Sequence, residues 1–384
     1  MLRLRERSHT RMLAATTLPT ATVEILPVFE EPLLEVVRLL REAANIEHAL
    51  MLQYLFAAFS VKDRYRLLAG EAAASGDTVL GVAIQEMRHL AEVNSLLVAL
   101  RVQPNLDRED FPFRTDLYPF VLELEPLTRR SLAKYVTAES PPGALDPATA
   151  PSDAERMFRE AIRKELGNVS VNHIGSLYGT VIDRLRQAVS AEPGLLPDVD
   201  ERVSGLQHIR EQGEGTHFQL FRSVFEATHP AFEGARDVWA DPAAELYPSR
   251  PLPRNPTAYP GAANSITDPR SRDLAWLSNL HYWLVLGLLY LGHLATDAAL
   301  IGRAQLHMVN CLHPLALALA AGNVGMPFDP LALNVGLGPD RDSNRSVLRR
   351  LVGEIRQRER EAGDALPPTY STFTTKLTLT ALGG

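Results

Sequence analysis

The sequence has little cysteine and few aromatic residues: Cys311 is the single cysteine, and aromatics make up 7% of 384 residues. One cysteine excludes an internal disulfide and a metal cage built from several thiolates. Apolar residues reach 46% and are rich in Ala and Leu. This composition favours helices packed on helices over a sheet core, in one large or two ordinary domains.

The sequence also lacks a basic stripe, a signal-peptide core and a long apolar run. With 39 basic and 46 acidic residues the formal charge is −7, so nucleic acid is not an expected partner. Thr, Pro and Glu residues interrupt positions 12–26. The most apolar run, 282–291, is too short to span a bilayer and predicts a buried core helix. We therefore expect a cytoplasmic protein without a membrane partner.

Apolar spacing and punctuation predict a three-part chain. Residues 1–28 form a flexible arm, residues 29–230 a four-helix bundle, and residues 231–384 a linker with a C-terminal helical region packed on the bundle. The bundle helices are expected over 31–61, 78–102, 152–189 and 198–228, and the later helices over 272–294, 298–321 and 343–362. A proline-rich connection over 103–152 holds one short helix near 128–139.

One motif occurs twice in this pattern. Glu86 and His89, and again Glu214 and His217, are three residues apart and share one face of a helix. With Glu47 on the first helix they match the ligand set of ferritin-like carboxylate bundles, which also have one long crossover. Glu47 and Glu214 are expected to bridge two cations, and the two histidines to be terminal ligands. The alternative is that these pairs are ordinary surface ion pairs.

The third helix lacks an obvious carboxylate at the right height. Counting back from the turn at 193–194 leads to His173 and Ser176, one turn apart. The site is therefore asymmetric, uses His173 as a ligand, or takes Glu139 from the crossover. Two further features lie nearby: Gly213 and Gly215 either permit close helix approach or mark a π-type bulge, and Tyr54 or Tyr178 is a proton or electron donor.

These residues resemble a known family. The matching segments are Gln53-Tyr54-Leu55, Glu86-Met87-Arg88-His89-Leu90, Glu139-Ser140-Pro141, Ile174-Gly175-Ser176-Leu177-Tyr178, Gln212-Gly213-Glu214-Gly215 and, later, Leu277-Ser278-Asn279-Leu280-His281-Tyr282. They resemble the ferritin-like domain family, in the branch of iminophenylpyruvate dimer synthase from violacein-type biosynthesis. The resemblance covers roughly residues 33 to 330 and implies a diiron-type bundle. Ser176 stands where family members often carry an acidic residue.

The resemblance implies an O2-dependent non-haem iron oxidase or oxygenase of specialised metabolism. Its substrate would be a small metabolite derived from tryptophan or another amino acid. Iron would be dinuclear or mononuclear, and Mn or Zn share the same ligands. Two alternatives stay open: a ferroxidase or iron-binding protein, and a metal-free helical scaffold. The apolar C-terminal helices favour a homodimer.

Overall fold

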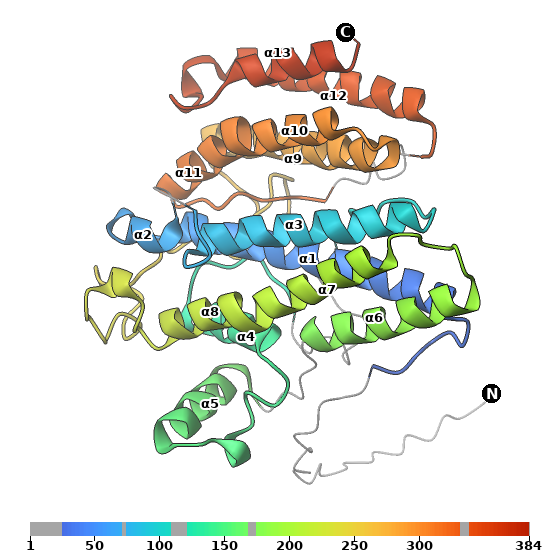
Figure 1. Ribbon diagram of the computed structural model, residues 1–384. Coiled ribbons are helices and arrows are strands. Elements are labelled where there is room, and N and C mark those ends of the chain that lie inside the picture. Colours follow the sequence, from blue (N-terminus) through green and yellow to red (C-terminus); the bar gives the residue numbers. More distant parts are fainter. Residues whose placement is uncertain (1–24, 71–73, 109–120, 168–173, 331–337, 384) are drawn as a thin grey trace, which may run out of the picture.

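The computed structural model describes residues 25–70, 74–108, 121–167, 174–330 and 338–383 (Figure 1). Regular structure in these ranges is helical, apart from two isolated bridges, Val61–Ser249 and Thr257–Ser265. The predicted all-α fold is therefore confirmed. Of the predicted N-terminal arm, residues 1–24 lie outside the described residues.

Helices α1 (Pro32–Ser60) and α3 (Val79–Ala99) lie side by side along most of their length and form the centre of the bundle (Figure 1). Glu31 begins α1 by accepting the backbone N–H groups of Leu33 and Leu34, as an acidic N-cap should. Short helical turns, Asp63–Tyr65 and α2 (Arg66–Ala69), connect the two. Almost every residue in the second half of α1 is buried, because helices cover it on several sides.

The third bundle helix differs from the prediction of one helix over 152–189. The chain forms α5 (Asp153–Leu166) and then α6 (Ile174–Ala191). Gly167 ends α5 with a φ of +80°, a conformation that glycine adopts without steric cost. Residues 168–173, and so His173, lie outside the described residues.

Two helices share the third place in the bundle. The crossover helix α4 (Arg129–Glu139) packs on α8, whereas α6 packs on α1 and α7. Figure 1 shows α4 below α8, α6 below α7, and α5 at the lower edge of the molecule, where it packs on α4. The last residue of α4, Glu139, and the second of α6, Gly175, line one pocket. The position of the third bundle helix is thus occupied by two separate helices, α4 and α6. The segment that connects them contains α5.

The fourth helix runs through a π-helical segment. Helix α7 (Val199–Gln212) continues into the π-helical Gly213–His217 and then α8 (Phe218–Phe225). The π-type bulge predicted from the two glycines is confirmed. It lies where this helix faces the end of α4, with which it is in contact.

The C-terminal helices stack beside the bundle, on the side of α3 (Figure 1). They are α9 (Pro269–Ala295), α10 (Ala298–His307), a π-helical Met308–Leu312, α11 (His313–Ala321), α12 (Arg341–Ala362) and α13 (Thr372–Ala381). Short 3-10 turns are Pro147–Thr149, Pro230–Phe232 and Gly363–Ala365. Helix α13 was not predicted, because it is rich in threonine, a weak helix former. One continuous apolar core includes residues from the bundle and from these helices.

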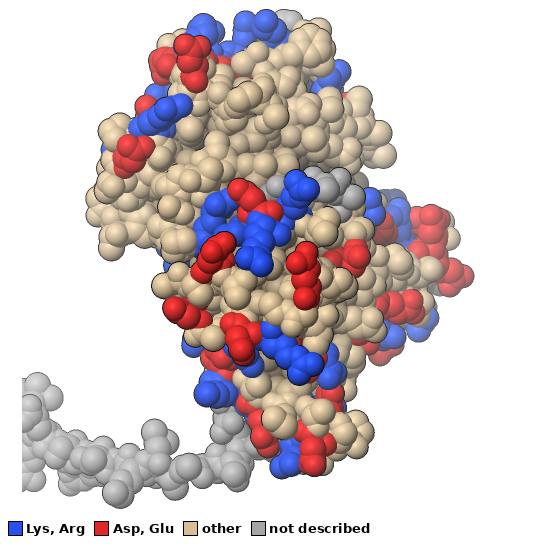
Figure 2. All heavy atoms as spheres, turned by 90° about the vertical axis from the view of Figure 1, so that its left-hand side faces the viewer, with Lys and Arg blue, Asp and Glu red and all other residues tan. Residues whose placement is uncertain are grey.

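Two C-terminal segments are long and apolar enough to cross a membrane. In Pro269–Ala295 the most apolar stretch is 83% buried, and in Ala298–Ala321 it is 50% buried. The first is therefore a core helix of this fold, as the sequence predicted. Leu306 and Val309 of the second segment and Phe373 of α13 stay exposed, and Figure 2 shows a broad uncharged area in the middle of the upper part of the face it presents, with charged side chains along its top and left edge. The predicted homodimer stays a prediction.

A buried histidine joins the bundle to the C-terminal layer. His48 of α1 donates from Nδ1 to the carbonyl of Asp107 (3.1 Å) and accepts at Nε2 from the hydroxyl of Tyr282 in α9 (2.8 Å). Burial, together with the charge of Arg108, lowers the pKa of His48 to about 4. The ring must therefore stay neutral in the folded protein.

We expect this histidine to make stability depend on pH. Between pH 6.5 and 4 the unfolded chain binds a proton that the folded chain does not, so His48 lowers the free energy of unfolding by about 3 kcal/mol as the pH falls through this range. Chemical denaturation at several pH values measures the loss. The variant His48→Gln keeps a donor and an acceptor without titrating, so its pH slope should be smaller. Equal slopes would contradict the prediction.

Candidate metal centre

A single carboxylate lies at the middle of the predicted site. Glu86 on α3 is buried, with 2% of its surface exposed. Its Oε2 lies 2.7 Å from Nδ1 of His89, and its Oε1 lies 2.9 Å from Nδ1 of His217. One carboxylate thus faces an imidazole on each side.

Each of the two histidines also lies close to a second carboxylate. Oε2 of Glu47, on α1, lies 3.5 Å from His89 Nδ1, and Oε2 of Glu139, at the end of α4, lies 3.5 Å from His217 Nδ1. The ligand atoms form two groups, Glu47–Glu86–His89 and Glu86–Glu139–His217, each within 4.8 Å. Because Glu86 belongs to both groups, the arrangement suits two neighbouring cations that share one carboxylate.

Each of the two histidines has a glutamine side chain as its outer hydrogen-bond partner. Gln212 Oε1 lies 2.8 Å from His89 Nε2, and Gln85 Oε1 lies 2.8 Å from His217 Nε2. An amide oxygen only accepts, so each imidazole carries its proton on Nε2 when neutral and offers the Nδ1 lone pair to the centre. The hydroxyls of Tyr178 and Tyr54 donate to Oε1 of Glu47 and of Glu139, which leaves each Oε2 for the centre.

The donor atoms at the centre fit a cation. Glu47 Oε2, Glu86 Oε1 and His217 Nδ1 are buried and have no hydrogen bond within the described residues, although the last two atoms are only 2.9 Å apart. Buried polar atoms without partners are rare and costly in proteins. Their convergence within two groups of carboxylate and imidazole donors is what iron, manganese or zinc would satisfy.

When no metal cation is bound, protons supply the positive charge at the centre. Burial and the neighbouring Glu86 raise the pKa of Glu47 to about 8. Burial alone would lower the pKa of both imidazoles, but Glu86 outweighs it and raises that of His217 to about 10 and that of His89 well above its usual range. Burial opposes ionisation of Glu86, yet His217 and His89 hold its pKa well below normal. A divalent cation would displace these protons.

Glu214 takes a different place from the one predicted. It lines the pocket beside Gly175 and Arg210, belongs to neither ligand group, and is only partly buried. Glu86 occupies the shared position that we expected for Glu47 and Glu214. The π-helical segment explains this, because a π turn holds more residues than an α turn, so positions three apart no longer superimpose. Gly213 faces Glu139 instead, and a Cβ there would lie 2.8 Å from Glu139 Oε2.

The carboxylate missing from the third helix comes from α4. Counting residues back from the turn at 193–194 assumes one continuous third helix, and it leads to His173 and Ser176. The interruption brings Glu139 to that level, which was one of the alternatives left open. Gln85 and Arg210 are not predicted from the sequence as site residues, and Gln212 stands out only as part of a motif. The two glutamines could have been identified from their position in the sequence, because each lies within two residues of a Glu-x-x-His pair.

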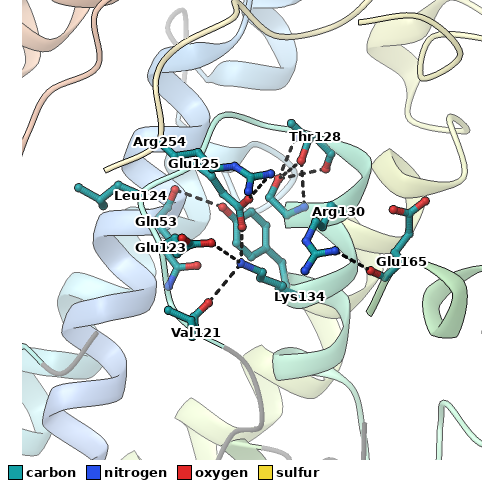
Figure 3. Close-up of polar contacts among 12 residues, drawn as sticks. Gln53, Val121, Glu123, Leu124, Glu125, Thr128, Arg130, Lys134, Glu165 and Arg254 are labelled. Atoms are coloured by element: carbon teal, nitrogen blue, oxygen red, sulfur yellow. Dashed lines mark hydrogen bonds and ion pairs between the residues drawn. The ribbon is translucent and has the colours of Figure 1, made fainter. Parts of the chain in front are cut away.

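A buried ion pair holds α4 where Glu139 can reach the centre. Lys134 Nζ lies 2.6 Å from Glu125 Oε1 and 3.6 Å from Glu123 Oε2, and it donates to the carbonyl of Val121. Figure 3 shows these groups around the Lys134 ammonium, with Arg254 also approaching Glu125. Lys134 and Glu125 are 4% and 0% exposed at their side chains, so each depends on the other for its charge.

A pocket of about 270 Å³, which includes space open to solvent, leads to the centre. Its lining residues are Glu47, Glu86, His89, Ala138, Glu139, Ile174, Gly175, Ile209, Arg210, Gly213 and Glu214. Arg210 Nε is buried and has no hydrogen-bond partner among the described residues, and the positive charge of Arg210 acts on the neighbouring Glu214. Arg210 is therefore a cationic side chain in the lining of the pocket.

Removing Lys134 should destabilise the fold. Lys134→Met leaves Glu125 buried with only the more distant Arg254, and breaking such a pair costs about 3–5 kcal/mol. Denaturation with urea measures the change in unfolding free energy. The double variant Lys134→Met, Glu125→Leu should recover most of the loss, because neither charge remains. A single variant as stable as the wild type would disprove the role of this pair.

The two glycines of the π-helical segment offer a matched test of the centre. Gly213→Ala places a methyl group against Glu139 and should remove the cation held by Glu86, Glu139 and His217, which halves the metal content per chain. Gly215→Ala has no atom within 4 Å of the new Cβ and should keep the full content. Both changes raise helix propensity by about 1 kcal/mol, so propensity does not separate them. Equal metal content would contradict the assignment of Glu139.

Comparison with known proteins agrees with the helical fold. A ferritin-like family model matches residues 40–195. Dichlorochromopyrrolate synthase of Lentzea aerocolonigenes is 27% identical over 379 residues, which covers 81% of this chain and 35% of that protein. The 2-imino-3-(indol-3-yl)propanoate dimerase of Chromobacterium violaceum is 27% identical over 325 residues, which covers 73% and 31%.

The chain spans about a third of the length of these curated relatives. A solved ferritin-like protein from Caulobacter vibrioides is 16% identical and covers 79% of this chain and 99% of its own, with a TM-score of 0.48. The resemblance predicted from the sequence is confirmed by the family model and the two enzymes: the chain contains a ferritin-like segment and is related to the dimer-synthase branch of specialised metabolism.

Proposed function

We propose that this chain is a dinuclear non-haem iron enzyme that uses O2 to oxidise a small 2-imino acid derived from an amino acid. The observation that carries the proposal is the pair of ligand groups that share Glu86. The relatives support the substrate class, since one is named as a dimerase of an indole-bearing 2-imino acid and the other as a synthase. Iron would supply the electron transfer to O2. Manganese and zinc bind the same donors, so metal analysis decides the identity.

The polar groups around the centre have distinct roles in this proposal. Tyr178 and Tyr54 hold the outer carboxylates in fixed orientation, and burial and the adjacent glutamates raise the pKa of both phenols well above normal. Both tyrosines therefore keep their protons and are the nearest phenolic donors to the centre. Gln212 and Gln85 hold the imidazole tautomers.

Arg210 is the group we assign to the substrate. A 2-imino acid carries a carboxylate, and a guanidinium is the side chain best shaped to bind one. Arg210 lines the pocket together with Glu47 and Glu86, and its Nε has no hydrogen-bond partner in the part of the chain that the structure describes. A substrate anchored there would have its reactive end directed towards the centre. The apolar part of the substrate would meet Ile174, Ile209 and Ala138.

Replacing Glu86 and Glu214 separately tests the proposal. Glu86→Ala removes the carboxylate common to both groups and should lose both metals and all O2 consumption with a 2-imino acid. Glu214→Ala should keep about two metals per chain, because Glu214 belongs to neither group. Metal is counted per chain after purification without chelator and reconstitution with Fe(II). Full metal content in Glu86→Ala would refute the site, and metal-loaded wild type that consumes no O2 would refute the oxidase.

A further inference from the structure

A second cluster of ligand-type side chains lies in the C-terminal layer, outside the centre described above. His281 of α9, His307 at the end of α10 and Cys311 in the π-helical Met308–Leu312 are all buried, and their donor atoms lie within 4.8 Å of one another. We propose that these three residues bind a single borderline transition-metal ion, such as Zn2+ or a copper ion. This inference does not depend on the proposed function of the bundle.

The hydrogen bonds around the two imidazoles support a cation between them. Nδ1 of His281 and Nδ1 of His307 face each other at 3.0 Å. On the far side, His281 Nε2 lies 2.5 Å from the Tyr370 hydroxyl, and His307 Nε2 lies 2.8 Å from the Thr378 hydroxyl. Each hydroxyl can donate only one hydrogen bond. A hydroxyl that donates to another group must therefore accept a hydrogen bond from the histidine N–H.

Both hydroxyls donate away from the imidazoles. Tyr370 donates to Glu359 Oε1 at 2.8 Å, and Thr378 donates to the carbonyl of Thr374 at 3.0 Å. Each hydroxyl therefore accepts from its histidine, which places the proton of both rings on Nε2. Two Nδ1 lone pairs then point at each other, an arrangement that a metal ion between them would stabilise.

The outer partners are those of a metal site. Metal-bound histidines usually donate their other N–H to a carboxylate, a carbonyl or a group linked to one, and this fixes the ring orientation. Here Glu359 acts through Tyr370, and the Thr374 carbonyl acts through Thr378. Thr375 donates a second hydrogen bond to Glu359 (2.6 Å), although burial raises the pKa of this carboxyl.

Cys311 supplies a ligand of a kind that the bundle centre lacks. It follows His307 by four residues, and the π-helical segment between them keeps both side chains on the same side. The first centre also lies at a π-helical segment, which ends at His217. Two nitrogens and one sulfur suit zinc or copper better than magnesium or calcium. A metal here would link α9 and α10 to the outer helices α12 and α13.

Cobalt binding to the full-length chain tests the proposal, because Cys311 is the only cysteine. Metal-stripped protein is titrated with Co2+, and absorption from sulfur-to-cobalt charge transfer is recorded. We expect this band to saturate at one cobalt per chain and to be absent in Cys311→Ser. Glu86→Ala is the matched control: it removes cobalt from the bundle centre and should keep the band.

A second variant tests the outer partner. Tyr370→Phe removes the hydroxyl that accepts from His281 and should weaken cobalt binding at this site by about 10–100-fold while the band remains. Wild-type protein that binds cobalt without the sulfur band, or binds none, would overturn the proposal. In that case a single proton lies between the two imidazoles and Glu359 is protonated. The wild-type spectrum decides between these outcomes even if a variant fails to fold.

Discussion

The structure depends on the charge balance around Glu86. Glu47, Glu86 and Glu139 are at most 4% exposed and converge on one point inside the bundle. An ionised carboxylate taken out of water costs several kcal/mol even after the protein relaxes, and three of them repel one another. The bundle can therefore close only when protons or cations offset these charges, and burial beside Glu86 raises the pKa of Glu47 to about 8. The two imidazoles carry positive charge as protons, or cations carry it as metal.

Two departures from regular helix geometry bring the donors to this point. The π-helical segment turns His217 inwards and places Gly213, which has no side chain, opposite Glu139. The interruption between α4 and α6 lets the end of one helix present Glu139 and the start of the next present Tyr178. Both departures cost regular hydrogen bonding, and such features gather at functional sites because packing elsewhere compensates for them.

The fold was predictable from local patterns, whereas the ligand set was predictable only in part. Apolar spacing and caps located α1, α3, α9 and α12 within a few residues, because each buries a continuous apolar stripe. Glu86, His89 and His217 followed from the repeated spacing. Glu139 had no such pattern: it comes from a crossover helix, and its place depends on the pair Lys134–Glu125 and on the break in the third helix. Glu214 matched the spacing, but the π turn removed it from the centre.

The C-terminal layer contributes to the geometry of the metal centre. His48 follows Glu47 directly, and its orientation is held by Tyr282 from α9 on one side and the Asp107 carbonyl on the other. A shift of α9 would therefore move the turn of α1 that carries Glu47. The cluster of His281, His307 and Tyr370 contacts a different face of the same helix, because neighbouring residues such as His281 and Tyr282 are about 100° apart around a helix. The position of α9 thus couples the outer helices to the geometry of the bundle centre.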